Sequence, residues 1–208
     1  MDAHLRAGIA VYNDGHYHAA HDAWEDYWLG LEQGTDDELL LHGLIQFTVA
    51  VYHARNRNWA GATSLAERAP TYLDPLPATY RGVNVGSARD YLADLDADPE
   101  RVERARPLRL THEGEALGLA DLDFAGTAVA AVVLAEDMGY DEAVFERAAG
   151  YARADVEAGE EGSRFVTLLF DFVRDAEHRG TVAQRLAEHG QRRADREADV
   201  EGFFDEGS

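Results

Sequence analysis

The stretch DELLLHGLIQFTVAVYHARN, residues 37–56, carries apolar side chains on most faces of the helix that its periodicity predicts. Thr35 or Asp36 can cap the start of this helix, and Glu38 is placed to form a capping box with Thr35. A helix that is apolar on most faces must be surrounded by other elements. The stretch therefore predicts the central helix of an all-α fold.

Helical patterns also lie on both sides of this stretch, where apolar residues recur at helical spacing between turn signals. They cover approximately residues 5–12, 16–29, 59–72, 84–98, 124–138, 141–158, 164–177 and 181–204. The first of these patterns is short and the last is charged nearly all round, and such patterns do not always form packed bundle helices. We therefore expect an antiparallel bundle of about seven to eight helices. Residues 108–120 instead alternate about Glu113-Gly114, which is typical of a short β-hairpin.

The natural seam of the chain lies between Pro99 and Pro107. We expect a helical domain over residues 1–100 and a helical C-terminal region over residues 101–208. The second region is either a separate domain or the other half of one bundle. Both organisations are open to a chain of 208 residues, which is long enough to bury a sizeable core.

The charge of the chain is strongly acidic: 40 acidic residues stand against 19 basic ones, all of them arginine, for a formal net charge of −21. Such a surface repels phosphate backbones and anionic membranes, so we expect neither nucleic acid nor membrane as a partner. Self-repulsion weakens in concentrated salt, where the screening length falls to about 3 Å at 1 M. A carboxylate-rich chain without lysine is similar to the proteins of salt-accumulating archaea, so we expect a halophilic, archaeal protein.

The composition excludes several further classes of protein. Cysteine is absent, which excludes disulfide scaffolds, thiolate metal sites and cysteine nucleophiles. The N-terminal residues lack a basic region followed by an apolar core, and the longest apolar stretch, residues 128–135, is far shorter than the ~20 residues of a membrane helix. We therefore expect a cytoplasmic protein.

Ionisable and aromatic side chains are concentrated in the stretch YHAAHDAWEDYW, residues 17–28. On a helix, His21, Glu25 and Trp28 share one face, and His18 lies one turn earlier on the same side. A histidine and a carboxylate at this spacing can reach a common point. They therefore suit a divalent metal ion or a proton-relay pair.

The central helix carries a second polar stripe, which includes His42 and Gln46. If residues 16–29 and 37–56 form an antiparallel hairpin, Glu25 lies beside His42 and His21 beside Gln46. We therefore expect a buried polar cluster in which His21, Glu25 and His42 are the candidate ligands of a divalent metal, zinc or manganese. The supporting side chains on the same two helices are His18, Asp22, Trp28 and Gln46.

Three motifs mark the first third of the chain: Tyr12-Asn13-x-Gly15-x-Tyr17, His21-x-x-x-Glu25-x-x-Trp28 and Asn58-Trp59-x-Gly61-Ala62. Together they resemble the uncharacterised prokaryotic family called domain of unknown function 309, over about residues 5–75. The resemblance implies a helical fold and a metal-binding role for the histidine and the glutamate, and no known reaction. The family usually has glutamate directly after the histidine, where this chain has Asp22.

Two functions remain open on these patterns. In the first, a divalent cation at His21 and Glu25 activates water, as in a metal-dependent hydrolase. In the second, the cluster is a structural hydrogen-bond network within a non-enzymatic interaction or scaffold module, whose short helix pairs resemble tetratricopeptide packing. A scaffold module of this kind is compatible with the chain forming a homodimer. The sequence does not identify the substrate or a protein partner.

We expect the fold to depend on salt, because screening is what allows so many carboxylates to share one compact surface. Dialysis from multimolar potassium chloride into a low-salt buffer should reduce the helical far-UV circular dichroism signal. A spectrum that does not change on dialysis would contradict a salt-adapted surface.

Overall fold

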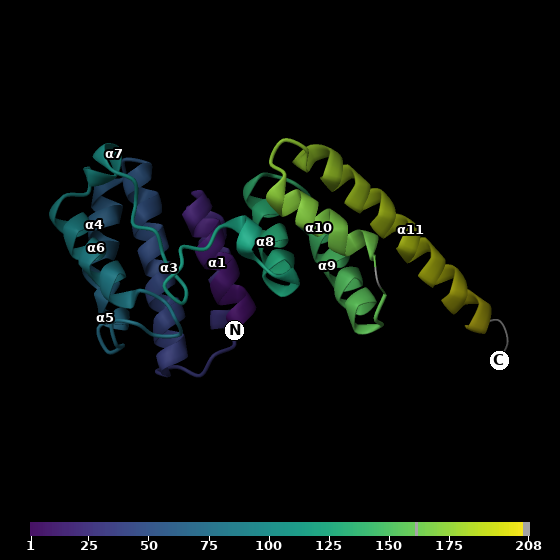
Figure 1. Cartoon of the computed structure of the whole chain (residues 1–208), viewed down its shortest axis with the longest axis horizontal. Helices are drawn as coiled ribbons and strands as arrows, with labels where there is room; N and C mark the ends of the chain where they lie inside the picture. The colour runs from purple at the N-terminus through teal and green to yellow at the C-terminus, as the bar shows by residue number, and fades with distance from the viewer. Residues whose placement is uncertain (161, 206–208) are drawn as a thin grey trace.

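The structure, a computed structural model, describes residues 1–160 and 162–205, with the side chains of 1–160 and 162–199. No strand occurs in this part of the chain, which confirms the all-α fold class (Figure 1). Its helices are α1 (Asp2–Asp14), α2 (Tyr17–Trp28), α3 (Asp36–Arg55), α4 (Trp59–Arg68), α5 (Pro70–Leu73), α6 (Val85–Ala97), α7 (Arg101–Arg104), the single 3-10 turn η1 (Leu119–Asp121), α8 (Phe124–Asp137), α9 (Glu142–Glu157), α10 (Arg164–Arg174) and α11 (Arg179–Asp205). The described residues thus form more helices than the seven to eight expected, in part because α5 and α7 are four-residue turns.

The helix α3 is central to the first half of the chain, as its apolar faces predict. It packs against α2, α4, α5 and α7. Its start is capped by Thr35, whose hydroxyl oxygen accepts a hydrogen bond from the Glu38 amide at 3.3 Å. The other half of the expected capping box is different, because the Glu38 carboxylate accepts from the amide of Gly34 at 3.2 Å rather than from that of Thr35.

The hairpin expected near residues 108–120 does not form as a pair of strands in the described chain. The turn lies where the sequence predicts it, since Glu113 and Gly114 both adopt positive φ, 52° and 84°. On either side of this turn, His112 forms only isolated bridges, to Glu115 and to Val83. A lone two-stranded hairpin is marginally stable, and here side chains of other elements take the hydrogen bonds that strands would have made.

Asn13, at the end of α1, holds this irregular segment in place. Its side-chain amide donates to the carbonyl oxygens of Leu110 and Leu117, both at 2.8 Å, and its side-chain oxygen accepts from the Leu110 amide at 2.9 Å. The neighbouring Tyr12 hydroxyl donates to the Leu108 carbonyl at 2.8 Å. Residues that follow the predicted boundary at 100 therefore lie against the first helix.

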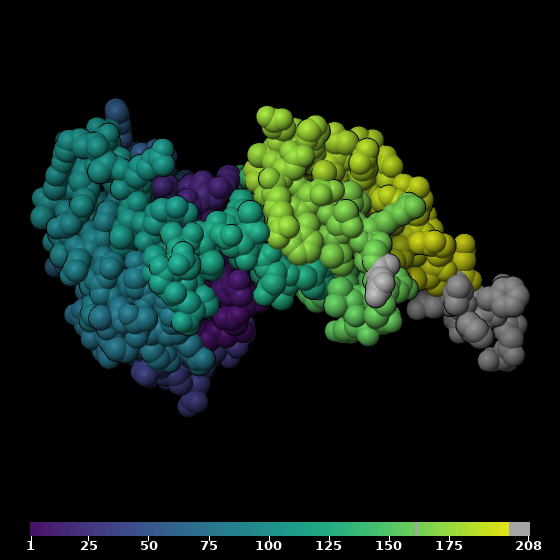
Figure 2. Space-filling model, in the orientation of Figure 1, coloured from purple at the N-terminus to yellow at the C-terminus, as the bar shows by residue number. Residues whose placement is uncertain are grey.

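The two halves of the chain meet at α8, which packs against α1 and α2 as well as against α9 and α10. In the space-filling view they form two lobes, with the purple α1 between them (Figure 2). The buried apolar side chains of both halves belong to one continuous cluster. Among the described helices, none combines the length and the hydropathy that a membrane span requires.

Replacing Asn13 with alanine should lower the free energy of unfolding by about 2–4 kcal/mol, because three hydrogen bonds to the 110–117 segment are lost at once. Thermal unfolding in concentrated salt measures the effect. The matched control is Asn56→Ala: the Asn56 side chain is exposed and donates only to the Tyr52 carbonyl, so that variant should differ little from the parent. Equal effects of the two substitutions would contradict the conclusion that Asn13 holds the 110–117 segment in place.

Candidate functional site

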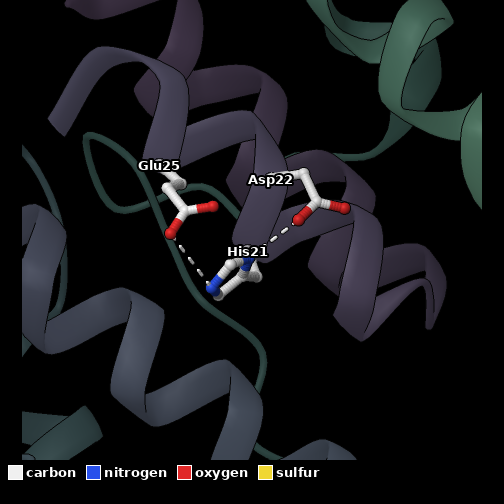
Figure 3. Close-up of side chains that lie close together, drawn as sticks. All are labelled: His21, Asp22 and Glu25. Carbon is white, nitrogen blue, oxygen red and sulfur yellow. Dashed lines mark hydrogen bonds and ion pairs between the residues drawn. The ribbon is translucent and has the colours of Figure 1, made fainter. Parts of the chain in front are cut away.

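Three ionisable side chains, His21, Asp22 and Glu25, lie together along one edge of α2 (Figure 3). The opposite face of this helix is buried through its small residues and Trp24. The edge that carries the three side chains is only half-buried: the exposed fractions are 23% for His21, 21% for Asp22 and 41% for Glu25. The cluster is therefore open to solvent, and the expectation of a cluster inside an apolar interior is wrong.

His21 is held between the two carboxylates. Its Nδ1 atom lies 2.7 Å from Asp22 Oδ1, and its Nε2 atom lies 3.8 Å from Glu25 Oε1. An ionised carboxylate can only accept a hydrogen bond, so the proton of this contact belongs to Nδ1. In the neutral ring, the lone pair of Nε2 then faces Glu25. One ligand atom from each of the three residues fits within a span of 4.8 Å.

The electrostatics of this edge favour positive charge. The hydrogen bond to Asp22 raises the pKa of His21, partial burial of the ring opposes that effect, and the charges of Asp22 and Glu25 raise the pKa further, so that it lies above its ordinary value. The exposed His18 also approaches Asp22, with its Nδ1 at 3.1 Å from Asp22 Oδ2. The two carboxylates thus stabilise either a proton on His21 or a cation beside it.

His42, the third ligand expected from the sequence, does not join this group. The imidazole of His42 contacts Trp28, with ring centroids 4.8 Å apart, rather than Glu25. The ring of Tyr52 likewise faces His18 at 5.9 Å. The antiparallel pairing of α2 and α3 is present, but the contacts along this edge are offset by three residues from the expected pairs, just under one helical turn. Asp22 occupies the place in the cluster that was assigned to His42.

Gln46, expected beside His21, is half-buried on α3. Among the described residues, no hydrogen bond connects its side chain to His21 or to Glu25. The polar stripe of α3 therefore lies next to the candidate site without contributing a donor or an acceptor to it.

Glu38 carries the buried carboxylate of this region. The sequence predicted that Glu38 takes part in capping the helix, but it did not reveal the further role of this side chain in connecting α2 and α3. Its side chain is only 8% exposed, and Oε1 accepts from the indole nitrogen of Trp28 at 2.8 Å and contacts Nδ1 of His42 at 3.2 Å. With the Gly34 amide on Oε2, these partners connect α2, the intervening turn and α3. Burial alone would raise the pKa of Glu38, but the hydrogen bonds outweigh burial and hold this pKa below its ordinary value.

Trp28, the aromatic residue of the motif, therefore packs against other rings and donates a hydrogen bond, and it does not belong to the open cluster. Its ring lies against His42, which is stacked on Tyr72 at 3.7 Å between ring centroids. The histidine and the glutamate of the same motif lie earlier on the same edge, where His21 contacts Asp22 and Glu25. One sequence motif thus contains two structural units, a network in which half-buried Trp28 donates to the buried Glu38, and an accessible cluster at His21.

Replacing Glu38 with glutamine should lower the free energy of unfolding by about 1–3 kcal/mol at neutral pH, since a buried group that accepts three hydrogen bonds is altered. The folded-state pKa of Glu38 is depressed, so its contribution is complete above the unfolded pKa and is lost as pH falls through the folded one. The difference between parent and variant should therefore shrink below about pH 4.5. Denaturant titrations at several pH values measure it.

The exposed Glu32, in the same turn region, provides the control: Glu32→Gln should leave stability nearly unchanged at every pH. A Glu38→Gln variant as stable as the parent at neutral pH would show that the Glu38 carboxylate does not hold the helices together.

The part of this chain that is similar to known proteins includes the helices that carry this site. Residues 5–65 match the family described as Domain of unknown function (DUF309). Over 91 residues, 44% of this chain, the sequence is 26% identical to an uncharacterized protein of Aquifex aeolicus (strain VF5). The match spans 27% of that protein's length, so the chain corresponds to about a quarter of this relative. The family match over residues 5–65 contains α2, α3 and most of α1 and α4, and with them His21, Asp22 and Glu25.

Proposed function

We propose that the edge of α2 binds a divalent cation, zinc or manganese, through His21 and Glu25. The observation that carries this proposal is the 3.8 Å separation of His21 Nε2 and Glu25 Oε1. This separation is long for a hydrogen bond. Two ligand atoms that each lie about 2.1 Å from one ion are themselves roughly 3–4 Å apart, so the pair is spaced as two ligands of one cation would be.

Asp22 supports this role of His21 in a second way. Histidine ligands usually donate their other ring proton to a carboxylate, which fixes the tautomer and the orientation of the ring. Asp22 Oδ1, at 2.7 Å from His21 Nδ1, provides that partner. We propose that Asp22 orients the ring of His21. The second oxygen of Asp22, Oδ2, lies beside His18 and can contact either His18 or the same ion.

A cation with two protein ligands keeps coordination positions for water or for substrate, which is the arrangement a metal-dependent hydrolase requires. Because the cluster is half-exposed, such water would be reached directly from solvent. We therefore propose hydrolysis as the reaction class of this site.

The non-enzymatic alternative assigns the cluster to structure only. In that reading, Asp22 is shared by His18 and His21 as part of an ordinary half-exposed network, and the helices serve as a scaffold, alone or as a homodimer. Exposed polar pairs contribute little to stability, which makes a purely structural role of this cluster weaker than that of Glu38.

The setting that we propose for this chemistry is the cytoplasm of a salt-accumulating archaeon. The support is the charge pattern, a net charge of −21 with arginine as the only cationic side chain besides histidine. A binding site for a divalent cation is compatible with such a surface, since acidic side chains attract cations from solution.

Protein prepared without an affinity tag and stripped with a chelator should bind Mn²⁺ or Zn²⁺ with one-to-one stoichiometry in isothermal titration calorimetry. Both His21→Gln and Glu25→Gln should abolish this binding, and Asp22→Asn should weaken it about tenfold. Affinity should fall from about pH 8 to about pH 6, because the raised pKa of His21 lets a proton compete for Nε2.

The exposed pair of His178 and Asp175, 2.8 Å apart, is the matched control, and His178→Gln should leave the binding intact. Absence of stoichiometric binding to the parent protein, or equal binding by the His21 variant, would contradict the metal proposal. If His21→Gln then also lowers stability without metal, the cluster has the structural role of the alternative.

A further inference from the structure

A separate cavity of about 630 Å³ opens between the ends of α1 and α3 and the segment that follows α7. In Figure 1 this segment descends from α7 between α3 and α1. The cavity is lined by residues 12–15, Tyr17, Arg55 and residues 102–109, and by none of the candidate metal ligands. We call it the arginine cavity, after the four arginines in its wall: Arg55, Arg104, Arg106 and Arg109.

The charge in this wall is opposite to that of the protein as a whole. Its acidic members are engaged elsewhere: Asp14 lies 3.7 Å from His16, and Glu103 pairs with Arg57 at 2.7 Å. Arg104 pairs with Asp98. Within the described residues, Arg55, Arg106 and Arg109 form no ion pair with a carboxylate, so three arginines without a carboxylate partner line one cavity in a chain of net charge −21.

Two tyrosines, Tyr12 and Tyr17, line the same wall. The rings of Tyr12 and Tyr17 lie 5.2 Å apart, and the hydroxyl of Tyr12 is already used as a donor to Leu108. Tyr91, which is not a lining residue, is 7% exposed and its hydroxyl has no hydrogen-bond partner among the described residues. Burial raises the pKa of Tyr91 to about 12, and Arg101, Tyr17 and Arg55 are near enough for their charges to act on it. Of the two lining tyrosines, only Tyr17 has a hydroxyl that forms no hydrogen bond within the described residues, and it is the donor that the lining offers beside the arginines.

The wall is also held in a fixed position before any ligand arrives. Asn13 holds the Leu110 backbone, and the Arg55 guanidinium donates to the Val102 carbonyl at 3.1 Å. Asn84 accepts from the Thr111 amide at 2.8 Å and donates to the Arg109 carbonyl at 3.3 Å. A site whose backbone is already fixed loses less entropy when a ligand binds.

We propose that the arginine cavity binds a small oxyanion of the phosphate or carboxylate class through Arg55, Arg106 and Arg109, with the Tyr17 hydroxyl as an additional donor. The planar guanidinium group offers paired N–H donors that match the oxygens of such groups. The volume of about 630 Å³ is within the usual range for small-molecule sites and leaves space for an organic portion against the tyrosine rings.

Inorganic phosphate is the probe, titrated into the full chain at fixed potassium chloride concentration and followed by phosphorus NMR or calorimetry. The parent protein should bind one phosphate saturably. The double substitution Arg106→Gln with Arg109→Gln should weaken binding at least tenfold, and Tyr17→Phe should weaken it several-fold while the helical circular dichroism signal stays unchanged. Both arginines are exposed, so their loss should not unfold the protein.

The matched control removes the same charge elsewhere, through Arg147→Gln with Arg153→Gln on the exposed side of α9, and should retain the parent affinity. A parallel titration with acetate separates the two sources of oxyanion, since the tighter binder identifies the class of the natural ligand. Saturable binding of neither anion would overturn the proposal. An equal loss of affinity in both double variants would also overturn it, because the effect would then be that of net charge alone.

Discussion

The carboxylate of Glu38 is buried at the junction of α2 and α3, where it accepts hydrogen bonds from the Trp28 indole and the Gly34 amide and contacts His42. A buried charge is tolerated only when it is paired and hydrogen-bonded, so the burial of Glu38 requires the two helices and their turn to hold these positions together. The pairing of α2 with α3, together with the packing of α1 and α8 on α2, determines which side of α2 is buried against the core. It therefore also determines which edge of α2 remains accessible.

His21, Asp22 and Glu25 lie on that accessible edge, and Trp28 lies at the C-terminal end of the same helix, so one motif serves two purposes at different levels of α2. Half-buried Trp28 donates a hydrogen bond to the buried Glu38, whereas half-buried His21 contacts Asp22 and Glu25. The imidazole receives its orientation from a carboxylate on its own helix and does not depend on α3. Rigid support on one side and solvent on the other is the arrangement that a cation site needs for exchange.

Much of the fold followed from periodicity alone, because helix positions are set locally by apolar spacing, caps and turn residues. The buried faces of α3 and the cap at Thr35 were predictable for this reason. The partner of His42 was not predictable, because sliding one packed helix past the other by three residues leaves the apolar spacing within each helix unchanged. The segment around His112 escaped prediction for a related reason. His112 and Glu115 pair locally, but the residues on either side bond to Asn13 and Asn84, about 100 and 30 residues away in sequence, beyond the range of any local pattern.

A double-mutant cycle on Trp28→Phe and Glu38→Gln, measured by unfolding in concentrated salt at neutral pH, tests the pairing of the two helices most directly. The two side chains are in contact at 2.8 Å, so the effects of the single substitutions should be non-additive, with a coupling energy of about 1 kcal/mol or more. Additive effects, with a coupling energy near zero, would show that the Trp28 indole and the Glu38 carboxylate act independently. The pairing of α2 and α3 would then have to rest on apolar packing alone.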